Sequence, residues 1–117
     1  MKQYKITNNI IGWIVFAIAA FTYCMTVEPS ASFWDCPEFI STATKLEVGH
    51  PPGAPFFMLT GNFFTHFTGD PAKAAFCVNI MSALLSALCI LFLFWTITHM
   101  VRRVLTPRAH LGKQGFE

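Results

Sequence analysis

Two long apolar runs, separated by a more polar segment, dominate the pattern of the chain. Residues 10–27 carry no charge, and residues 74–100 are apolar apart from one Asn, one His and several Ser and Thr. A helix needs about 20 apolar residues to cross the hydrocarbon core of a bilayer. Trp13 and Tyr23 lie near the two ends of the first run, where interfacial aromatic residues are common. The pattern predicts an all-α integral membrane protein with two transmembrane helices.

The loop between these spans, residues 28–73, contains two shorter helical patterns. Asp35 is followed by a Pro two positions later and by Glu38 three positions later, which is typical of a helix start with a capping box. Gly49 predicts the end of this helix. The apolar side of the helix consists of Phe39, Ile40, Ala43 and Leu46. Residues 55–67 repeat Phe and Leu at helical spacing but are too short to span. We therefore expect one or two short amphipathic helices in the loop. The first would lie along the membrane surface or against neighbouring helices, and the second would lie along the surface or re-enter the membrane.

The distribution of charge predicts the orientation of the chain. Residues 1–9 and 101–117 hold six of the eight Lys and Arg residues, whereas residues 28–73 hold five of the six Asp and Glu residues. By the positive-inside rule, both tails are cytoplasmic and the loop is extracytoplasmic. An alternative is a signal peptide that is cleaved near Ser32, which would leave a secreted or single-span product. The first apolar run is longer than the roughly 7–15 residues usual for the apolar region of a signal peptide, which favours a retained span.

The composition excludes several classes of protein. Hydrophobic residues make up 54% of the chain and charged residues only 12%, whereas soluble domains have about 25% charged residues. Lipid is therefore the expected partner of most of the surface. Nucleic acid is not an expected partner, because no basic stripe is interleaved with aromatic residues.

The four cysteines, Cys24, Cys36, Cys77 and Cys89, do not form a CxxC motif. Three of them lie in apolar runs, where Cys acts as a small apolar side chain. A disulfide from Cys36 to Cys24 or Cys77 is the less favoured alternative.

Candidate chemistry is concentrated in the loop. Asp35 and Glu38 are spaced as neighbours on a helix, and a carboxylate in a partly dry site can act as a general base or hold a metal or a sugar hydroxyl. The same spacing is also explained by capping alone. His50 before two prolines could bind a phosphate, act in acid–base chemistry or cap the preceding helix. Lys45 lies on the polar side of the first loop helix, with Glu38, and we assign it with His50 to substrate binding. No metal or cofactor is expected, because the spacing of Asp35, Glu38 and His50 matches no standard zinc pattern.

Two motifs carry a resemblance to a known family. Residues 34–40 read WDCPEFI and residues 49–57 read GHPPGAPFF, and Asn79 follows near the start of the second span. In this order and separation they resemble the N-terminal part of a family of bacterial multi-pass membrane proteins. That family is similar to the protein O-mannosyltransferases of the GT-C superfamily. The resemblance implies a location in the bacterial inner membrane, with the loop in the periplasm.

The resemblance also implies roles for the loop residues. Asp35 would be the general base that activates the acceptor hydroxyl of a protein, with Glu38 supporting or positioning it. His50 would lie near the acceptor or near the polyprenyl-phosphate sugar donor. GT-C enzymes have many more spans, so we expect this chain to be the N-terminal part of a glycosyltransferase. It would need further transmembrane helices and would be inactive alone.

A different class of function is suggested by the second span. The residues Ser82, Ala83, Ser86 and Ala87 are small and recur on one helix face, which allows another helix to pack closely. The alternative function is therefore a small two-span interaction or assembly subunit without catalysis. Asn79, near the outer end of this span, is expected to form interface hydrogen bonds rather than to belong to a site.

Overall fold

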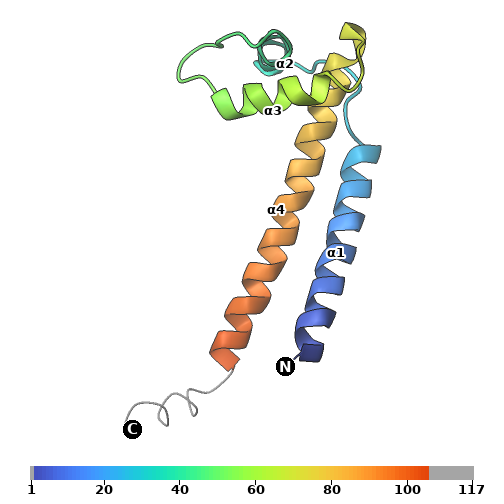
Figure 1. Cartoon of the computed structure of the whole chain (residues 1–117), viewed down its shortest axis with the longest axis vertical. Helices are drawn as coiled ribbons and strands as arrows, with labels where there is room; N and C mark the ends of the chain where they lie inside the picture. Colours follow the sequence, from blue (N-terminus) through green and yellow to red (C-terminus); the bar gives the residue numbers. More distant parts are fainter. Residues whose placement is uncertain (1, 106–117) are drawn as a thin grey trace.

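The computed structural model describes residues 2–105 and contains only helices as regular structure in that range, so the predicted all-α fold is confirmed. Two long helices are joined through a compact group of short ones, which we call the head, residues 28–73 (Figure 1). The elements are α1 (Lys2–Met25), α2 (Cys36–Lys45), α3 (Pro55–Thr65), the short 3₁₀ helix η1 (Pro71–Lys73) and α4 (Ala74–Leu105).

The two long helices form an antiparallel hairpin that places the N-terminus and the end of α4 on the same side, away from the head (Figure 1). Close approach depends on Gly12, which is buried: a Cβ at this position would collide with the Trp95 indole and would lie 3.2 Å from Cδ1 of Leu91. A small residue at the contact lets the two backbones approach, as in helix pairs within membranes.

Both long helices are apolar and long enough to cross a membrane. The candidate spans are Gln3–Met25, with a mean hydropathy of 1.5, and Pro71–Leu105, with 2.4. Only 6% and 22% of their most apolar windows are buried within the chain. A core helix of a soluble protein would be mostly buried, so this exposed apolar surface fits lipid or further helices.

The two long helices differ from the predicted spans of residues 10–27 and 74–100 at their ends: α1 starts earlier and ends at Met25, two residues before the predicted end, and α4 ends later. α1 begins at Lys2 and includes most of the predicted polar tail, because backbone hydrogen bonding continues into water where the lipid ends. α4 continues to Leu105, with Arg102 and Arg103 in its last turn. The predicted tail beyond residue 105 lies outside the described residues.

Asn79 joins the hairpin to the head. Its side-chain Nδ2 donates to the backbone carbonyls of Glu28 at 2.9 Å and Ser30 at 3.0 Å, just after the end of α1. The prediction that Asn79 forms interface hydrogen bonds is confirmed. Its two bonds fix the path by which the chain leaves α1 and enters the head.

The small residues of α4 divide between two environments. Ala83 and Ala87 are buried, in line with Leu91 on the face of α4 that runs beside α1, whereas Ser82 and Ser86 are exposed. The helix that covers the alanines therefore belongs to the same chain. This arrangement removes much of the reason for the assembly-subunit alternative.

The core of the head is built around the first turns of α4. Ile40 of α2 clusters with Val78 and Met81 of α4, and Phe57 and Phe64 of α3 pack against this cluster. α3 crosses the upper end of α4 (Figure 1). This packing fixes α2 and α3 relative to the hairpin.

α2 ends earlier than predicted. Its last residue is Lys45, and Leu46 follows in the left-handed conformation with φ 55°, so the prediction that Gly49 ends the helix is wrong. The side-chain Nδ2 of Asn62 on α3 donates to the carbonyls of Ala43 at 3.0 Å and Thr44 at 2.9 Å. A side chain from another helix therefore satisfies carbonyls that a helix C-terminus leaves unpaired.

α3 ends at Thr65, two residues before the predicted end at residue 67. The side chains predicted to form its apolar stripe, Phe56, Leu59, Phe63 and Phe67, are all exposed. The buried residues of α3 are Met58 and Gly61, and a Cβ at Gly61 would lie 2.9 Å from the Cβ of Ala43. The apolar stripe faces outward, which suits a helix in contact with lipid. All four cysteines are free thiols.

Candidate functional site

The N-terminal turn of α2 carries both predicted carboxylates, but they do not form a capping box. Asp35 is the N-cap residue and accepts only through its backbone carbonyl, from the Phe39 N–H at 3.0 Å. Its φ of −80° and ψ of −6° are already helical, whereas a capping Asp normally has an extended backbone that lets its side chain reach the first turn. No side-chain capping bond forms. The capping-box prediction is wrong.

Glu38 instead ties α2 to the loop that follows it. Its Oε1 accepts the backbone N–H of His50 at 2.8 Å, and its Oε2 lies 2.9 Å from Nδ1 of the same residue. A carboxylate only accepts hydrogen bonds, so Nδ1 carries the proton in this pair. The His50 ring also meets the Phe39 ring edge-to-face, with centroids 6.0 Å apart. The HPPG turn, residues 50–53, is therefore bound to α2 through both the backbone N–H and the side chain of His50.

The pair shifts the titration of both partners. The hydrogen bonds from the His50 backbone and side chain hold the pKa of Glu38 below its ordinary value of 4.5. The hydrogen bond to Glu38, followed by the charges of Glu38 and then Asp35, raises the pKa of His50 above 6.5. Both groups are partly exposed, so solvent screens the pair. Near neutral pH, Glu38 is an anion and a weak base, and His50 has increased cationic character.

Asp35, Glu38 and His50 are therefore brought to one end of α2. The negative charge of Asp35 contributes to the raised pKa of His50, which places Asp35 within electrostatic reach of the pair. Asp35 itself is exposed. Within residues 2–105 no group of three or more His, Cys, Asp or Glu side chains is arranged to hold a metal ion.

Lys45 lies apart from these three residues. It occupies the last turn of α2, and Asp35 precedes the first, so about 15 Å along the helix axis, at 1.5 Å per residue, separates them. The side chain of Lys45 is exposed. The structure does not bring it together with His50, and its assignment to substrate binding stays a prediction.

Comparison with known proteins identifies the family. Residues 35–115, well over half of the chain, match the model of the protein O-mannosyl-transferase TMEM260 N-terminal domain. The chain belongs to this family. The predicted resemblance to the N-terminal part of protein O-mannosyltransferases is thereby confirmed.

Two curated relatives agree with the TMEM260 assignment. The chain is 31% identical over 85 residues to the protein O-mannosyl-transferase tmem260 of Dictyostelium discoideum. The aligned region covers 72% of this chain and 10% of the relative. It is 34% identical over 83 residues to the protein O-mannosyl-transferase TMEM260 of Mus musculus, which covers 71% of this chain and 12% of the relative. The chain thus spans about a tenth of the length of these relatives, and both are eukaryotic. No solved structure matches the chain.

The TMEM260 match begins at Asp35, the residue at which the candidate site begins. The residue before it, Trp34, has a φ of 72°, a left-handed conformation that is unusual for a bulky side chain, and it is 92% exposed. Backbone outliers of this kind are concentrated at functional sites. Sequence reasoning did not find this feature, because Trp at a positive φ has no sequence signature.

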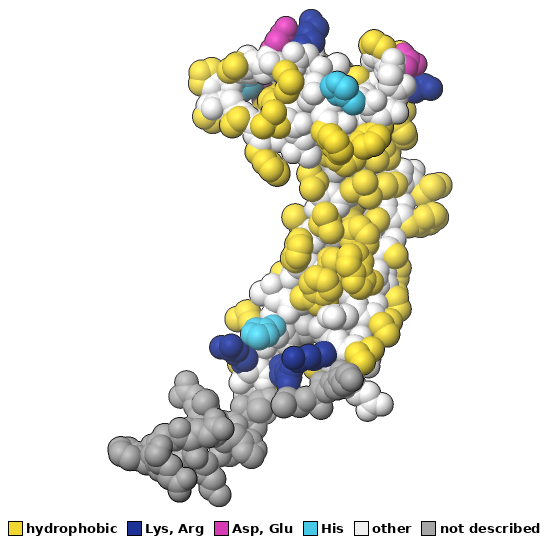
Figure 2. Space-filling view, viewed as in Figure 1, with side chains coloured by type: hydrophobic (Ala, Val, Ile, Leu, Met, Phe, Trp, Pro, Cys, Tyr) yellow, Lys and Arg dark blue, Asp and Glu magenta, His cyan; other side chains and the backbone are white. Residues whose placement is uncertain are grey.

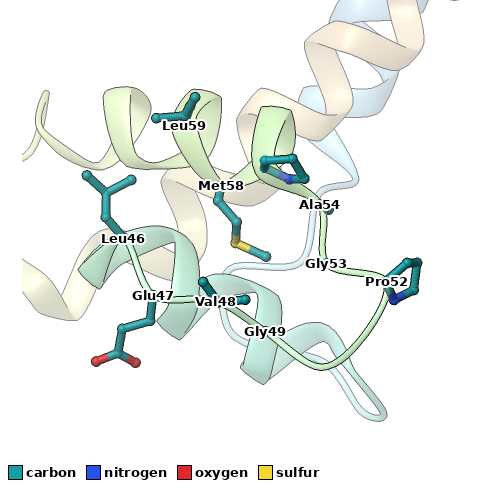
Figure 3. Close-up of a pocket in the computed structure, with 10 residues that line it drawn as sticks. Leu46, Glu47, Val48, Gly49, Pro52, Gly53, Ala54, Met58 and Leu59 are labelled. Atoms are coloured by element: carbon teal, nitrogen blue, oxygen red, sulfur yellow. The ribbon is translucent and has the colours of Figure 1, made fainter.

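Sequence reasoning also missed an apolar cavity of about 430 Å³ beside the Glu38–His50 pair. It lies between the end of α2, the HPPG turn and the start of α3, and its apolar walls include Leu46, Val48, Met58 and Leu59 (Figure 3). Gly49 connects it to the pair, since a Cβ there would lie 3.3 Å from Oε1 of Glu38 and 3.9 Å from Cε of Met58. The apolar residues on both sides of the HPPG motif were the sequence feature that could have predicted this cavity.

Proposed function

We propose that this chain supplies the N-terminal membrane part of a GT-C-type glycosyltransferase. The enzyme would transfer a sugar from a polyprenyl-phosphate donor to a hydroxyl group of a protein. One observation carries this proposal. Glu38 is engaged by both polar groups of His50, while Asp35 stands at the start of the same helix without a capping bond.

The different hydrogen bonding of the two carboxylates supports different proposed roles for them. A general base must accept a proton from the reacting hydroxyl, and both oxygens of Glu38 already accept from His50 while its pKa is lowered. Asp35 has no such side-chain bond at the helix start. Asp35 is therefore the proposed base, and Glu38 is a positioning residue that holds His50 and the HPPG turn.

In the proposed sugar transfer, the oxygen of the acceptor hydroxyl forms a bond to the anomeric carbon of the sugar. Asp35 takes the proton of that hydroxyl at the same time. The bond from that carbon to the phosphate oxygen breaks, and the polyprenyl phosphate leaves with the electron pair. The cationic character of His50 favours the negative charge that develops on the leaving phosphate. Lys45, at the other end of α2, is proposed to contact a more distant part of the substrate.

The proposed orientation places both termini in the cytoplasm and the head on the opposite face of the membrane. In a bacterium this would be the inner membrane, with the head in the periplasm. The basic flanks of the spans support this orientation. The outer faces of α1 and α4 are apolar and exposed, which leaves room for further transmembrane helices of the same enzyme.

The test measures sugar transfer to a protein acceptor in cell membranes. The cells express the natural gene that encodes this chain. Removing a general base lowers the rate by about 10²–10⁴-fold, so Asp35→Asn should show a loss of this size. Asp70→Asn is the matched control. Asp70 accepts the Ala72 N–H at 3.0 Å as the cap of η1, and Asn caps a helix about as well as Asp.

Transfer that is unchanged in Asp35→Asn would remove Asp35 from the catalytic role. Equal losses in the two variants would show that both act through folding of the head. Either result would overturn the assignment.

A further inference from the structure

A second, polar cavity lies at the opposite end of the molecule from the head. It has a volume of about 290 Å³ and is formed between α1 and α4 near the end that carries both termini. This volume is at the lower end of the roughly 300–1,000 Å³ that is usual for ligand sites. The polar side chains in its walls are Lys5, Asn8, Asn9, Thr98, His99 and Arg102. The cavity therefore suits a small polar group rather than a large ligand.

The walls of this cavity have the chemistry of an anion site. Lys5 and Arg102 supply two positive charges, and among residues 2–105 no carboxylate lines the cavity. The side-chain amides of Asn8 and Asn9 can donate hydrogen bonds, and a neutral His ring retains one N–H donor, whereas the Thr98 hydroxyl already donates to the Trp95 carbonyl at 3.1 Å. Charged donors and side-chain amides from two helices converge here, and phosphate oxygens are the acceptors that Arg and Lys recognise most readily.

The Arg102 side chain is held in the cavity wall by a contact between the two helices. Its guanidinium carbon lies 5.0 Å from the centre of the Tyr4 ring on α1, a cation–π distance. This contact orders a long side chain, so part of the entropy cost of placing its charge is met before any ligand binds.

The apolar side of the cavity is marked by Trp95. Its indole N–H is buried and, among the described residues, has no hydrogen-bond partner. An unpaired buried donor costs about 1–3 kcal/mol. This N–H lies against Gly12 in the contact between α1 and α4, because a Cβ at Gly12 would collide with the indole, so Trp95 contributes an apolar wall to the cavity rather than a donor.

The position of the cavity selects the source of the anion. Lys5, Asn8 and Asn9 precede the apolar run that begins at residue 10, and Arg102 follows the run that ends at residue 100. Figure 2 shows Lys, Arg and His side chains gathered at this end of the hydrophobic hairpin. In a membrane, this level is where the head groups of lipids lie. We propose that this cavity binds the phosphate group of an anionic phospholipid.

The experiment uses the full chain in detergent and measures retained lipid by native mass spectrometry, with phosphatidylglycerol and phosphatidylcholine as probes. We expect preferential binding of phosphatidylglycerol. Arg102→Ala and Lys5→Ala should each weaken this binding about tenfold, since each removes a charge-assisted hydrogen bond. Arg103→Ala is the matched control: it removes the same charge one residue away, and Arg103 is exposed and does not line the cavity.

Three results would overturn the proposal. The first is equal retention of the two lipids. The second is an equal loss in Arg103→Ala, which would indicate a general surface charge effect. The third is competition by inorganic phosphate at the concentration of the lipid, which would identify a site for free phosphate.

Circular dichroism checks that the variants keep their helices. If either charge variant loses helical content, Asn8→Leu decides in its place. This change preserves the charge of the cavity and the approximate size of the side chain but removes an amide donor, and it should still weaken phosphatidylglycerol binding measurably. Unchanged binding in a folded Asn8→Leu variant would then contradict the proposal.

Discussion

The head and the hairpin are held together by different kinds of contact. In the head, polar side chains bridge separate segments: Glu38 binds His50, and Asn62 binds the last carbonyls of α2. The hairpin relies on close packing at Gly12, Ala83 and Ala87, and its outer surface is apolar and exposed. Specific hydrogen bonds hold the loop of the head in a single geometry, whereas apolar packing mainly keeps the two long helices together. Side chains held in fixed positions by hydrogen bonds are therefore found in the head, where the candidate site lies.

The largest expected effect on stability is in the hairpin. Gly12→Leu would push a side chain into the Trp95 indole and Leu91 and separate α1 from α4. Overpacking of this kind costs about 1–3 kcal/mol, sometimes more. The free energy of unfolding in detergent, from helical ellipticity against denaturant, measures the loss. Cys89→Ser is the control, because Cys89 is an exposed thiol on α4 and should change stability by less than about 0.5 kcal/mol. A Gly12→Leu variant as stable as wild type would show that close packing does not hold the hairpin.

A smaller loss of stability is expected when either of the two asparagines that donate to backbone carbonyls, Asn62 or Asn79, is replaced. Asn62→Ala removes the donor to the Thr44 carbonyl and leaves the Ala43 carbonyl with only the Leu46 N–H at 3.4 Å, and in this half-buried site it should cost about 1 kcal/mol. Asn79→Ala removes two similar bonds at an exposed site, where water replaces the donor, and should cost less.

Hydrogen exchange of the backbone amides measures this comparison. Asn62→Ala should increase exchange in the last turn of α2, and Asn79→Ala should increase it only around residues 26–32. If the Asn79 variant loosens α2 as much as the Asn62 variant does, the head and the junction are one cooperative unit.

A still smaller effect concerns pH. Glu38 has a lowered pKa, so its contribution is present above its ordinary value of 4.5 and is lost as pH falls through the lower folded value. His50 has a raised pKa, so its contribution is present below 6.5 and is lost as pH rises through the higher folded value. Both contributions of the Glu38–His50 pair are therefore fully present between pH 4.5 and pH 6.5. Because it is partly exposed, we expect added salt to weaken it.

The NMR shift of the His50 amide proton reports this window, since that N–H donates to Glu38. We expect a plateau between the two pH values and a change on each side of it. A shift that stays constant while the pH falls well below 4.5 and rises well above 6.5 would contradict the pairing.

Much of the fold follows from the sequence because its signals are local or repetitive. The uncharged run of residues 10–27 and the apolar run of residues 74–100 predict two helices by length alone. The residue pair Asp35 and Pro37 correctly predicts where α2 begins. The loop motifs and their order also identify the family.

The features that sequence reasoning missed depend on tertiary contacts. Glu38 forms its pair with His50, twelve residues away, instead of a local capping box, and Asn62 ends α2 from another helix. The left-handed Trp34 has no composition signal. Local rules describe the ends of helices well only while no distant partner competes for the same side chain, and in the head such partners are present.

The most direct test of the account is an NMR titration of the His50 imidazole in the wild type and in Glu38→Gln. Glu38 is engaged by His50, and Asp35 is the proposed base. We expect the wild-type pKa of His50 to lie above 6.5 and to fall in Glu38→Gln, because the amide removes the negative charge and the charge-assisted hydrogen bond. Asp70→Asn should leave the titration unchanged. A His50 pKa that is the same in the wild type and in Glu38→Gln would contradict the account.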